Sequence, residues 1–360
     1  MSNRFVDLTR GCALAFVVVT IGNVEIGASA LPPSTQPTDV KRCKIADLGR
    51  SATWTRTGFG QHVQILSLTG GRGIVVAAGN VAELLDVSTG ESLSSAEVPK
   101  RIVSISGWQE GLMAVANDGN AYLYKETNKR RLELVTTVAL PGITATVSPD
   151  GKHLFVGVPD SKAHRAQRWA VENAQPDITY TVPRRAELGC VGSLAVSNDG
   201  RFLAVSTPPR TCMFAAQSGE LLRCTEALRY AEELSFSADS STAATLSEQK
   251  AVVLRAASGE VIAELDHSPF VLTPGDQLRR CRLSADGSMA ITAAQSGCVF
   301  IWSVKSATVK LIVSTGEDCF ADPKGVPPPV VCFSGEDAVV IYSPAAETLY
   351  CVPLRHIGAD

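Results

Sequence analysis

Short runs of apolar and β-branched residues alternate with polar turn residues from about Lys41 to Leu354. No segment in this region carries apolar positions at the 3.6-residue spacing of a long amphipathic helix. The runs are separated by Gly, Asp, Ser and Pro, which favour tight turns between strands. The pattern predicts an all-β fold built from many short strands.

Tight turns recur along this region at an even spacing, each between two short apolar runs. They are centred on Gly70-Gly71, Glu110-Gly111, Asp150-Gly151, Asp199-Gly200, Ala238-Asp239, Asp286-Gly287 and Gly335-Glu336. The six intervals from the first turn to the last average 44 residues, and a four-stranded propeller blade takes about 40–45 residues. The spacing predicts a single domain over residues 41–354, a seven-bladed β-propeller.

A second kind of turn follows the first by about twenty residues and contains a small residue, Gly and Glu. Its copies are Ser88-Thr89-Gly90-Glu91, Gln217-Ser218-Gly219-Glu220 and Ala257-Ser258-Gly259-Glu260. Glycine adopts the positive φ that a tight hairpin requires. One blade is therefore predicted as strand, turn, strand, loop, strand, small-Gly-Glu turn and strand.

Residues 277–313 show the repeat most clearly, and they resemble a WD40 repeat. Arg280–Ser284 leads into the turn at Asp286-Gly287, and Trp302 stands where that family has a Trp at the end of the third strand. Ser148–Gly151 and Ser197–Arg201 resemble the family's first turn, and Trp169 takes the corresponding third-strand place. The resemblance implies a seven-bladed ring. Since the sequence has no Gly-His and no Trp-Asp pair, we do not expect the family's buried Asp-His-Ser-Trp network.

The last blade is short of one strand and predicts how the ring closes. Its three strand-like runs are Pro329–Phe333, Asp337–Tyr342 and Thr348–Leu354. A three-stranded blade would leave an exposed edge, and the run Lys41–Leu48 has no other partner. We therefore expect Lys41–Leu48 to complete the last blade. Cys43 would then lie beside Cys351, which predicts a disulfide that locks the closure.

The other cysteines suggest two further bridges. Cys212 and Cys224 are symmetric about Ser218, so they should face each other across a hairpin at bridging range; two small buried thiols are the alternative. Cys319 and Cys332 flank a Pro-rich loop that a disulfide would tether. No cysteine pair has the CxxC spacing of a zinc or redox site.

The N-terminus differs in pattern from the rest. Arg4 and Arg10 precede an apolar run, Gly11–Gly22, which is too short to span a bilayer, and Ala28-Ser29-Ala30 suits signal peptidase. Residues 1–30 are predicted as a signal peptide, 31–40 as a linker and 355–360 as a C-terminal tail. We expect a secreted, periplasmic or secretory-lumen protein. The alternatives are an N-terminal strand or uncleaved anchor and a cytoplasmic or ER-associated location.

Composition and motifs exclude several chemistries. The net charge of -3 gives no general attraction to nucleic acid. The histidines are scattered, and neither a metal-binding His motif, a GxSxG elbow nor a Walker-type phosphate loop occurs. We therefore predict no catalytic residue, metal ligand or cofactor, no integral membrane segment in the mature chain, and a monomer.

The inter-blade loops are the better candidates for binding. Two unusual ones, Asp266–Asp276 and Thr315–Pro329, leave neighbouring blades, and a third begins at Arg184-Arg185. Aromatic and Arg side chains dominate protein interfaces. The predicted partner-binding residues are Phe270, Phe320, Asp318, Asp322, Arg184 and Arg185. The alternative for both Phe residues is that they fill gaps between blades.

Three functions remain open. The first is a non-enzymatic scaffold that binds a protein partner through the inter-blade loop face. The second is a propeller enzyme or small-ligand binder with residues converging on the central channel. The third is a trafficking factor resembling the Sec12-type exchange factors, a family with a C-terminal membrane segment that residues 355–360 do not provide. Fold alone does not decide between them.

Overall fold

The computed structural model describes residues 40–50, 52–59, 62–68, 73–159, 165–183, 191–207, 210–225, 233–246, 249–270, 276–315, 327–335 and 337–356. All of them belong to one compact unit, residues 36–360. The predicted signal peptide lies outside the described residues, as do the linker up to residue 39 and residues 357–360 of the predicted tail.

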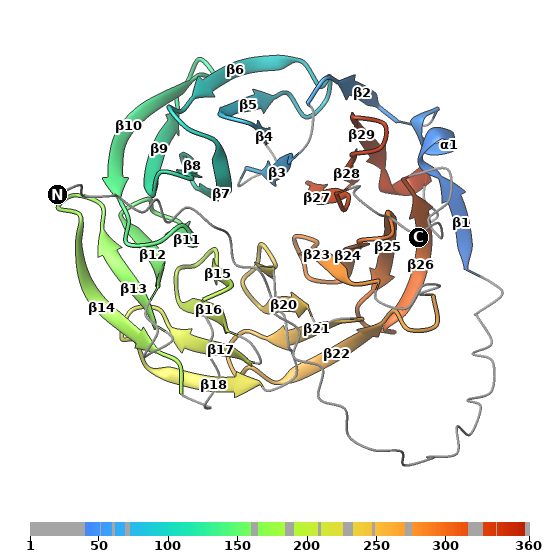
Figure 1. Cartoon of the computed structure of the whole chain (residues 1–360). Coiled ribbons are helices and arrows are strands. Elements are labelled where there is room, and N and C mark those ends of the chain that lie inside the picture. Colours follow the sequence, from blue (N-terminus) through green and yellow to red (C-terminus); the bar gives the residue numbers. More distant parts are fainter. Residues whose placement is uncertain are drawn as a thin grey trace, which may run out of the picture. The chain divides into compact units, whose positions relative to one another are not determined.

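Seven four-stranded antiparallel units form a ring, each running from an innermost to an outermost strand (Figure 1). Blade 1 consists of β3 (Gln64–Ser67), β4 (Ile74–Ala78), β5 (Val81–Leu85) and β6 (Ser92–Glu97). Blade 2 consists of β7 (Ile102–Trp108), β8 (Gly111–Ala116), β9 (Asn120–Glu126) and β10 (Leu132–Ala139). Blade 3 consists of β11 (Ala145–Val147), β12 (His153–Val158), β13 (Arg165–Ala170) and β14 (Gln175–Thr181). Blade 4 consists of β15 (Ser193–Val196), β16 (Phe202–Thr207), β17 (Arg210–Ala215) and β18 (Leu221–Thr225).

The remaining blades follow the same order. Blade 5 consists of β19 (Leu234–Phe236), β20 (Thr242–Leu246), β21 (Lys250–Arg255) and β22 (Val261–Asp266). Blade 6 consists of β23 (Leu278–Leu283), β24 (Met289–Ala294), β25 (Cys298–Ser303) and β26 (Thr308–Ser314). Blade 7 consists of β27 (Val330–Ser334), β28 (Ala338–Ser343), β29 (Thr348–Pro353) and β2 (Trp54–Thr57). The seven-bladed β-propeller predicted from the turn spacing is confirmed.

Burial explains the sequence pattern of the strands. The second strands are apolar along their length because neighbouring blades cover both of their faces; all six residues of β8 are buried. The outermost strands expose one side, so β10 and β14 mix buried and exposed positions. The core is therefore a series of apolar layers between adjacent blades.

The recurrent first turn is held by a Ser and an Asp two residues later. In blade 6 the Ser284 hydroxyl donates to Asp286 over 2.7 Å and accepts from the Met289 amide over 2.9 Å. Hydrogen bonds from the Ser288 amide and the Ser284 hydroxyl hold the pKa of Asp286 below its ordinary value. The same Ser–Asp pairing occurs in blades 3, 4 and 5. The turn therefore satisfies its own polar groups without a partner.

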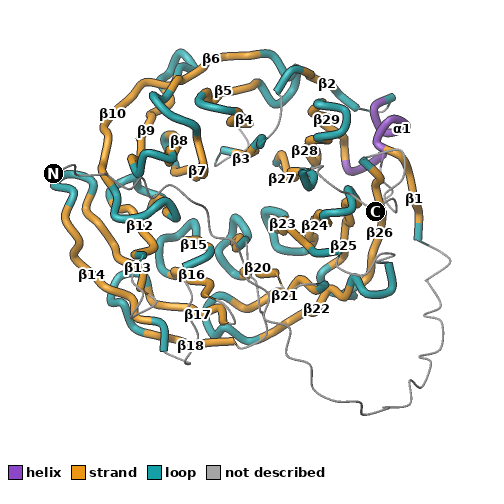
Figure 2. Tube along the Cα trace, in the orientation of Figure 1, coloured by secondary structure: helices purple, strands orange, loops and turns teal. Residues whose placement is uncertain are grey.

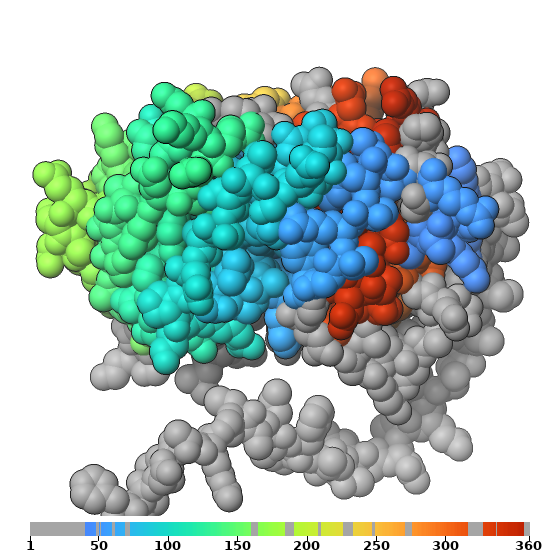
Figure 3. All heavy atoms as spheres, turned by 90° about the horizontal axis from the view of Figure 1, so that it is seen from above, coloured from blue at the N-terminus to red at the C-terminus, as the bar shows by residue number. Residues whose placement is uncertain are grey.

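The ring closes by an N-terminal strand, as expected, but the strand is β2 and not Lys41–Leu48. β2 pairs antiparallel with β29. β1 (Lys41–Lys44) instead pairs parallel with β26 as a fifth strand of blade 6, and α1 (Ile45–Gly49) connects the two regions (Figure 2). Trp54 is buried, whereas the strand Lys41–Lys44 is mostly exposed, so only β2 supplies the apolar contact that closure requires. Figure 3 shows blue N-terminal residues against the red last blade.

No described helix is long and apolar enough to cross a membrane.

Candidate functional site

The innermost strands of the seven blades surround a central channel with a cavity of about 850 Å³. Most described lining residues are apolar, small or hydroxyl-bearing. The charged residues among them are Glu233, Arg280 and Arg282. Arg280 and Arg282 lie on β23, and Glu233 directly precedes β19 of the neighbouring blade. The charge of the described channel wall is therefore concentrated between blades 5 and 6.

Glu233 connects these two blades through its buried carboxylate. Its Oε2 accepts a hydrogen bond from the Cys281 amide over 2.7 Å. Its Oε1 lies 2.7 Å from Nη2 of Arg282 and 3.7 Å from Nη1 of Arg280. Arg282 is thus the close ion-pair partner, and the Arg280 contact is longer than a hydrogen bond.

The channel wall also contains cysteine, but not in a reactive form. Burial raises the pKa of the Cys332 thiol, which lines the channel, to about 12. Burial likewise raises the pKa of Cys281, beside Glu233, to about 12. Both side chains are therefore neutral thiols near pH 7 and poor nucleophiles.

The described channel residues do not form a recognisable catalytic constellation. Glu233 is the sole acidic side chain among them, and none is a histidine. Within the described ranges, no three His, Cys, Asp or Glu residues are grouped closely enough to hold a metal ion. An arginine pair beside one carboxylate can bind and orient an anion, whereas the carboxylate itself is already engaged by Arg282 and the Cys281 amide.

Blade 6 contains a buried His–Thr–Trp network that the sequence analysis did not expect. The hydroxyl of Thr292 lies 2.6 Å from Nε2 of His267 and accepts a hydrogen bond from Nε1 of Trp302 over 3.1 Å. The other ring nitrogen of His267 bonds the carbonyl of Leu265 over 2.9 Å. Burial lowers the pKa of His267 to about 3. This network joins three residues and has Thr in place of Ser, so it differs from the family's Asp-His-Ser-Trp network. The dipeptide signatures did not reveal it, because it depends on side-chain position.

The predicted partner-binding residue Phe270 is buried, with 6% of its surface exposed. Its ring packs against Phe300 and Trp302, with centroids 5.9 and 6.1 Å away. The prediction that Phe270 is an exposed anchor for a partner was wrong, because the connection after β22 turns its aromatic side chain into blade 6. The other predicted contact residues, Phe320, Asp318, Asp322, Arg184 and Arg185, lie outside the described residues.

One face of the ring carries the long connections. In each blade the second-to-third turn and the connection to the next blade lie on the same face, because the strands alternate in direction. The connections after β14, β18, β22 and β26 contain 11, 8, 11 and 15 residues. On the opposite face, all first-to-second and third-to-fourth turns between consecutive strands contain six residues or fewer. The loop face is therefore most elaborate over blades 3 to 7.

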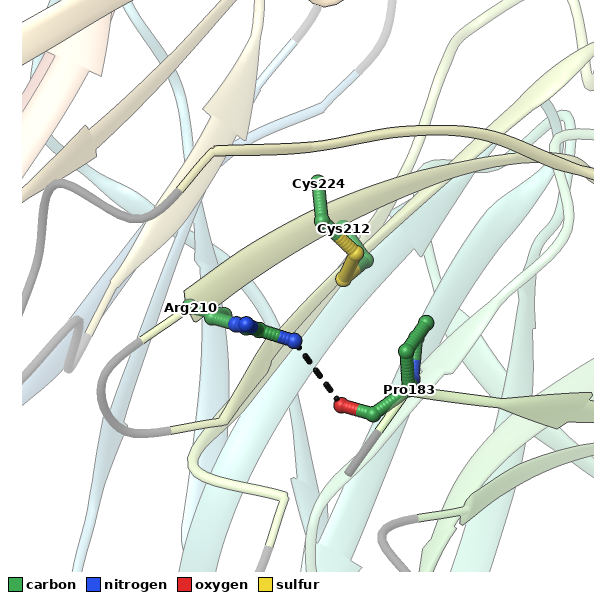
Figure 4. The surroundings of a disulfide bond; sticks show 4 residues. All are labelled: Pro183, Arg210, Cys212 and Cys224. Carbon is green, nitrogen blue, oxygen red and sulfur yellow. Dashed lines mark hydrogen bonds between the residues drawn. A yellow bond between two sulfur atoms is a disulfide. The ribbon is translucent and has the colours of Figure 1, made fainter. Parts of the chain in front are cut away.

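The loop face has described surface features as well. Ile143, in the connection between β10 and β11, lines the channel and is 53% exposed. Arg210 donates from Nη1 to the carbonyl of Pro183 over 3.1 Å, and so holds the start of the connection that continues through Arg184-Arg185 (Figure 4). These contacts place an exposed apolar residue at the channel and anchor one long connection.

A second exposed apolar surface lies on the outer rim. Leu221 and Leu222 begin β18, and Val261 and Ile262 begin β22; each is 37–40% exposed. These outermost strands belong to adjacent blades, and we refer to the four exposed residues together as the rim patch.

Of the three predicted disulfides, the structure joins Cys212 to Cys224, with the Cα atoms 4.1 Å apart (Figure 4). They are directly opposed on β17 and β18. The Cys43–Cys351 bridge was predicted wrongly: Cys43 is opposite Val313 in blade 6, and Cys351 is opposite Trp54 in blade 7. The displacement follows from the use of β2 for closure. The remaining bridge involves Cys319, which lies outside the described residues.

Comparison with known proteins supports the fold. The β-propeller domain of Cps50 (Swd1) from Myceliophteria thermophila superposes with a TM-score of 0.66 over 84% of this chain and 98% of that domain, at 9% sequence identity. No protein-family model matches the sequence, and no curated protein matches it either. At this identity the likeness shows the architecture, a WD40-like seven-bladed β-propeller.

Proposed function

We propose that the protein is a non-enzymatic scaffold that binds a protein partner through the inter-blade loop face. The unequal length of the connections on the two faces carries this proposal. Connections of 8 to 15 residues begin and end at strand termini on one face over consecutive blades. A rigid scaffold that presents variable loops is a common arrangement for binding sites.

The turns of the opposite face also support binding through the loop face, because they offer a partner less. Its Ser–Asp turns are short and bond internally, as Ser197 with Asp199 and Ser237 with Asp239. Polar groups that are already satisfied offer little to a partner. The one carboxylate of the described channel wall, Glu233, is held by Arg282 and the Cys281 amide, and no group of three possible metal ligands lies among the described residues, which favours binding over catalysis.

The binding experiment compares charge reversal on the two faces. The loop-face variant combines Arg184→Glu with Arg185→Glu, in the long connection between β14 and β15. The opposite-face variant combines Lys129→Glu with Arg131→Glu, in an exposed turn between β9 and β10. Partners from native extract are quantified by affinity capture with each variant. We expect the loop-face variant to lose partners that the opposite-face variant retains. Equal recovery by both variants contradicts the proposal.

A third variant distinguishes the rim patch. Leu222→Ser combined with Ile262→Ser removes exposed apolar surface without touching a loop. If this variant loses the partner and the loop-face variant retains it, the binding surface is the rim.

We also propose that the mature protein resides in an oxidising compartment after cleavage of residues 1–30. The close Cys212–Cys224 pair supports this location, because disulfides persist mainly in secreted and periplasmic proteins. Native protein is analysed by N-terminal sequencing and by intact mass before and after reduction. A start at Leu31 and a mass gain on reduction are expected. An intact Met1 with only free thiols would contradict this assignment.

A further inference from the structure

The channel wall between blades 5 and 6 contains more positive charge than it neutralises. Arg280 and Arg282 lie two residues apart on β23 and share a single carboxylate, Glu233. These are the charged residues among the described channel lining. The cluster therefore carries a formal charge of one positive unit in a confined space, where counter-charge is attracted strongly.

The geometry assigns Glu233 to Arg282 and leaves Arg280 available. Both oxygens of Glu233 are engaged at 2.7 Å, one by the Cys281 amide and the other by Arg282. Arg280 approaches the same carboxylate only to 3.7 Å. The side chain of Arg280 is 31% exposed and that of Arg282 is 29% exposed. Arg280 is the cation of the cluster without a close carboxylate contact.

Two polar atoms in this wall are buried without a hydrogen-bond partner in the described part of the chain. They are Nε of Arg280 and the hydroxyl oxygen of Ser235. Both residues line the channel, and Ser235 is only 8% exposed. An unsatisfied buried donor is costly, and native structures contain few of them. Both atoms are covered by neighbouring protein atoms, so a ligand oxygen could accept from them only after the side chain turns toward the channel.

We propose that the central channel is a binding site for a small organic carboxylate, held by the Arg280 guanidinium and the Ser235 hydroxyl. Arginine presents paired N–H donors that match a carboxylate. The cavity of about 850 Å³ has the size of a small-molecule site. The single net positive charge of the cluster balances the single negative charge of one carboxylate. Phosphate can carry a second negative charge, which the neighbouring Glu233 would repel. This site is independent of the loop-face function proposed above.

The test follows the arginine Nε–H signals of the full protein by NMR during titration with benzoate at constant ionic strength. Parallel titrations use acetate, inorganic phosphate and chloride. We expect a saturable shift of the Arg280 Nε–H signal with benzoate or acetate, with a Kd of about 1 mM or tighter. A shift of equal size with chloride, tighter binding of phosphate, or no saturable shift overturns the proposal.

Variants locate the site. Arg280→Gln should weaken carboxylate binding about tenfold or more, since a charge-assisted contact is lost. The matched control is Arg279→Gln: Arg279 is adjacent on β23, but it donates to Gln295 over 3.1 Å and does not line the channel. Its binding should equal wild type. If Arg280→Gln does not fold, Ser235→Ala and Arg280→Lys provide the same comparison. Wild-type affinity in folded channel variants contradicts the site.

Discussion

In blade 6, Nε2 of His267 lies 2.6 Å from the hydroxyl oxygen of Thr292. That hydroxyl already accepts a hydrogen bond from Trp302, so its own proton is free to go to His267. The other ring nitrogen faces the carbonyl of Leu265, which can only accept. His267 is therefore a neutral imidazole with its proton on Nδ1. It follows the outermost strand of blade 5 and connects that strand to blade 6.

Removing the Thr292 hydroxyl should destabilise the protein more than the same change in the neighbouring blade. Thr292→Val removes the hydrogen-bond partner of Nε2 of His267 and of Nε1 of Trp302, which costs about 2–4 kcal/mol. Thr245 is buried in the corresponding position of β20 and bonds Thr211 over 3.2 Å. Thr245→Val should cost about 1 kcal/mol. Urea unfolding of both variants measures the difference, and equal losses would show that the network adds nothing.

Acid should weaken the fold through His267. Burial holds its folded-state pKa near 3, while an unfolded His titrates near 6.5. Between these values the unfolded state binds more protons, so the free energy of unfolding decreases as the pH falls. The slope is at most about 1.4 kcal/mol per pH unit for one group. Unfolding from pH 6.5 down to about 4.5, above the main carboxylate range, should show a steeper loss in wild type than in His267→Gln. Parallel curves contradict this prediction.

Reduction should lower stability by the amount expected for a short cross-link. Cys212 and Cys224 are separated by 12 residues, for which the loss of loop-closure constraint corresponds to about 3 kcal/mol. Thermal unfolding of the oxidised protein with and without dithiothreitol measures this effect. The double variant Cys212→Ser with Cys224→Ser is the control and should not respond to reductant. A wild type that does not respond either would contradict a bridge in the native protein.

Deletions from the N-terminus should distinguish β1 from β2. Trp54 donates from Nε1 to the carbonyl of Val87 over 2.7 Å, and Arg56 pairs with Glu83 at 2.7 Å, so β2 fastens blade 7 to blade 1. Among the described residues, removal of residues 1–44 takes away Val40 and the added edge strand β1, and we expect a cooperative fold to remain. Removal of residues 1–58 opens the ring and should abolish cooperative unfolding.

A point variant tests the same closure within the full chain. Trp54→Ala should cost about 3–5 kcal/mol, the usual loss for a buried Trp. Calorimetry of the two deletion variants and of Trp54→Ala measures their order of thermal stability. If the 1–44 deletion is as damaging as the 1–58 deletion, β1 and not β2 closes the ring.

The blade repeat could be predicted because its signals are local. The Asp286-Gly287 turn needs only a few neighbouring residues, and glycine there has a φ of 70°. Trp302 opposes Ala290 on the second strand of its blade, and Trp169 opposes Leu154 in the same way. The sequence places both Trp residues correctly because strand order and turn spacing repeat along the chain.

The missed features depend on contacts between distant segments. The basic, exposed strand Lys41–Lys44 was assigned to the closure by its position in the chain, although Trp54 carries the apolar surface that the closure buries. Alternation along β23 could have placed Arg280 and Arg282 on one side of an innermost strand, and so in the channel. Their shared partner, Glu233, precedes them by more than 40 residues and could not be paired from spacing.

The sequence by itself determined the number of blades, their strand order and the opposed Cys212–Cys224 pair, because each follows from turns and alternation within a few dozen residues. Only the tertiary structure decided which N-terminal strand closes the ring, that His267 reaches Thr292 and Trp302, and that Phe270 is buried. It also brought Glu233 to Arg280 and Arg282. The physical reason is that these contacts join separate blades, and curvature of the ring, which no local pattern encodes, sets the distances between them.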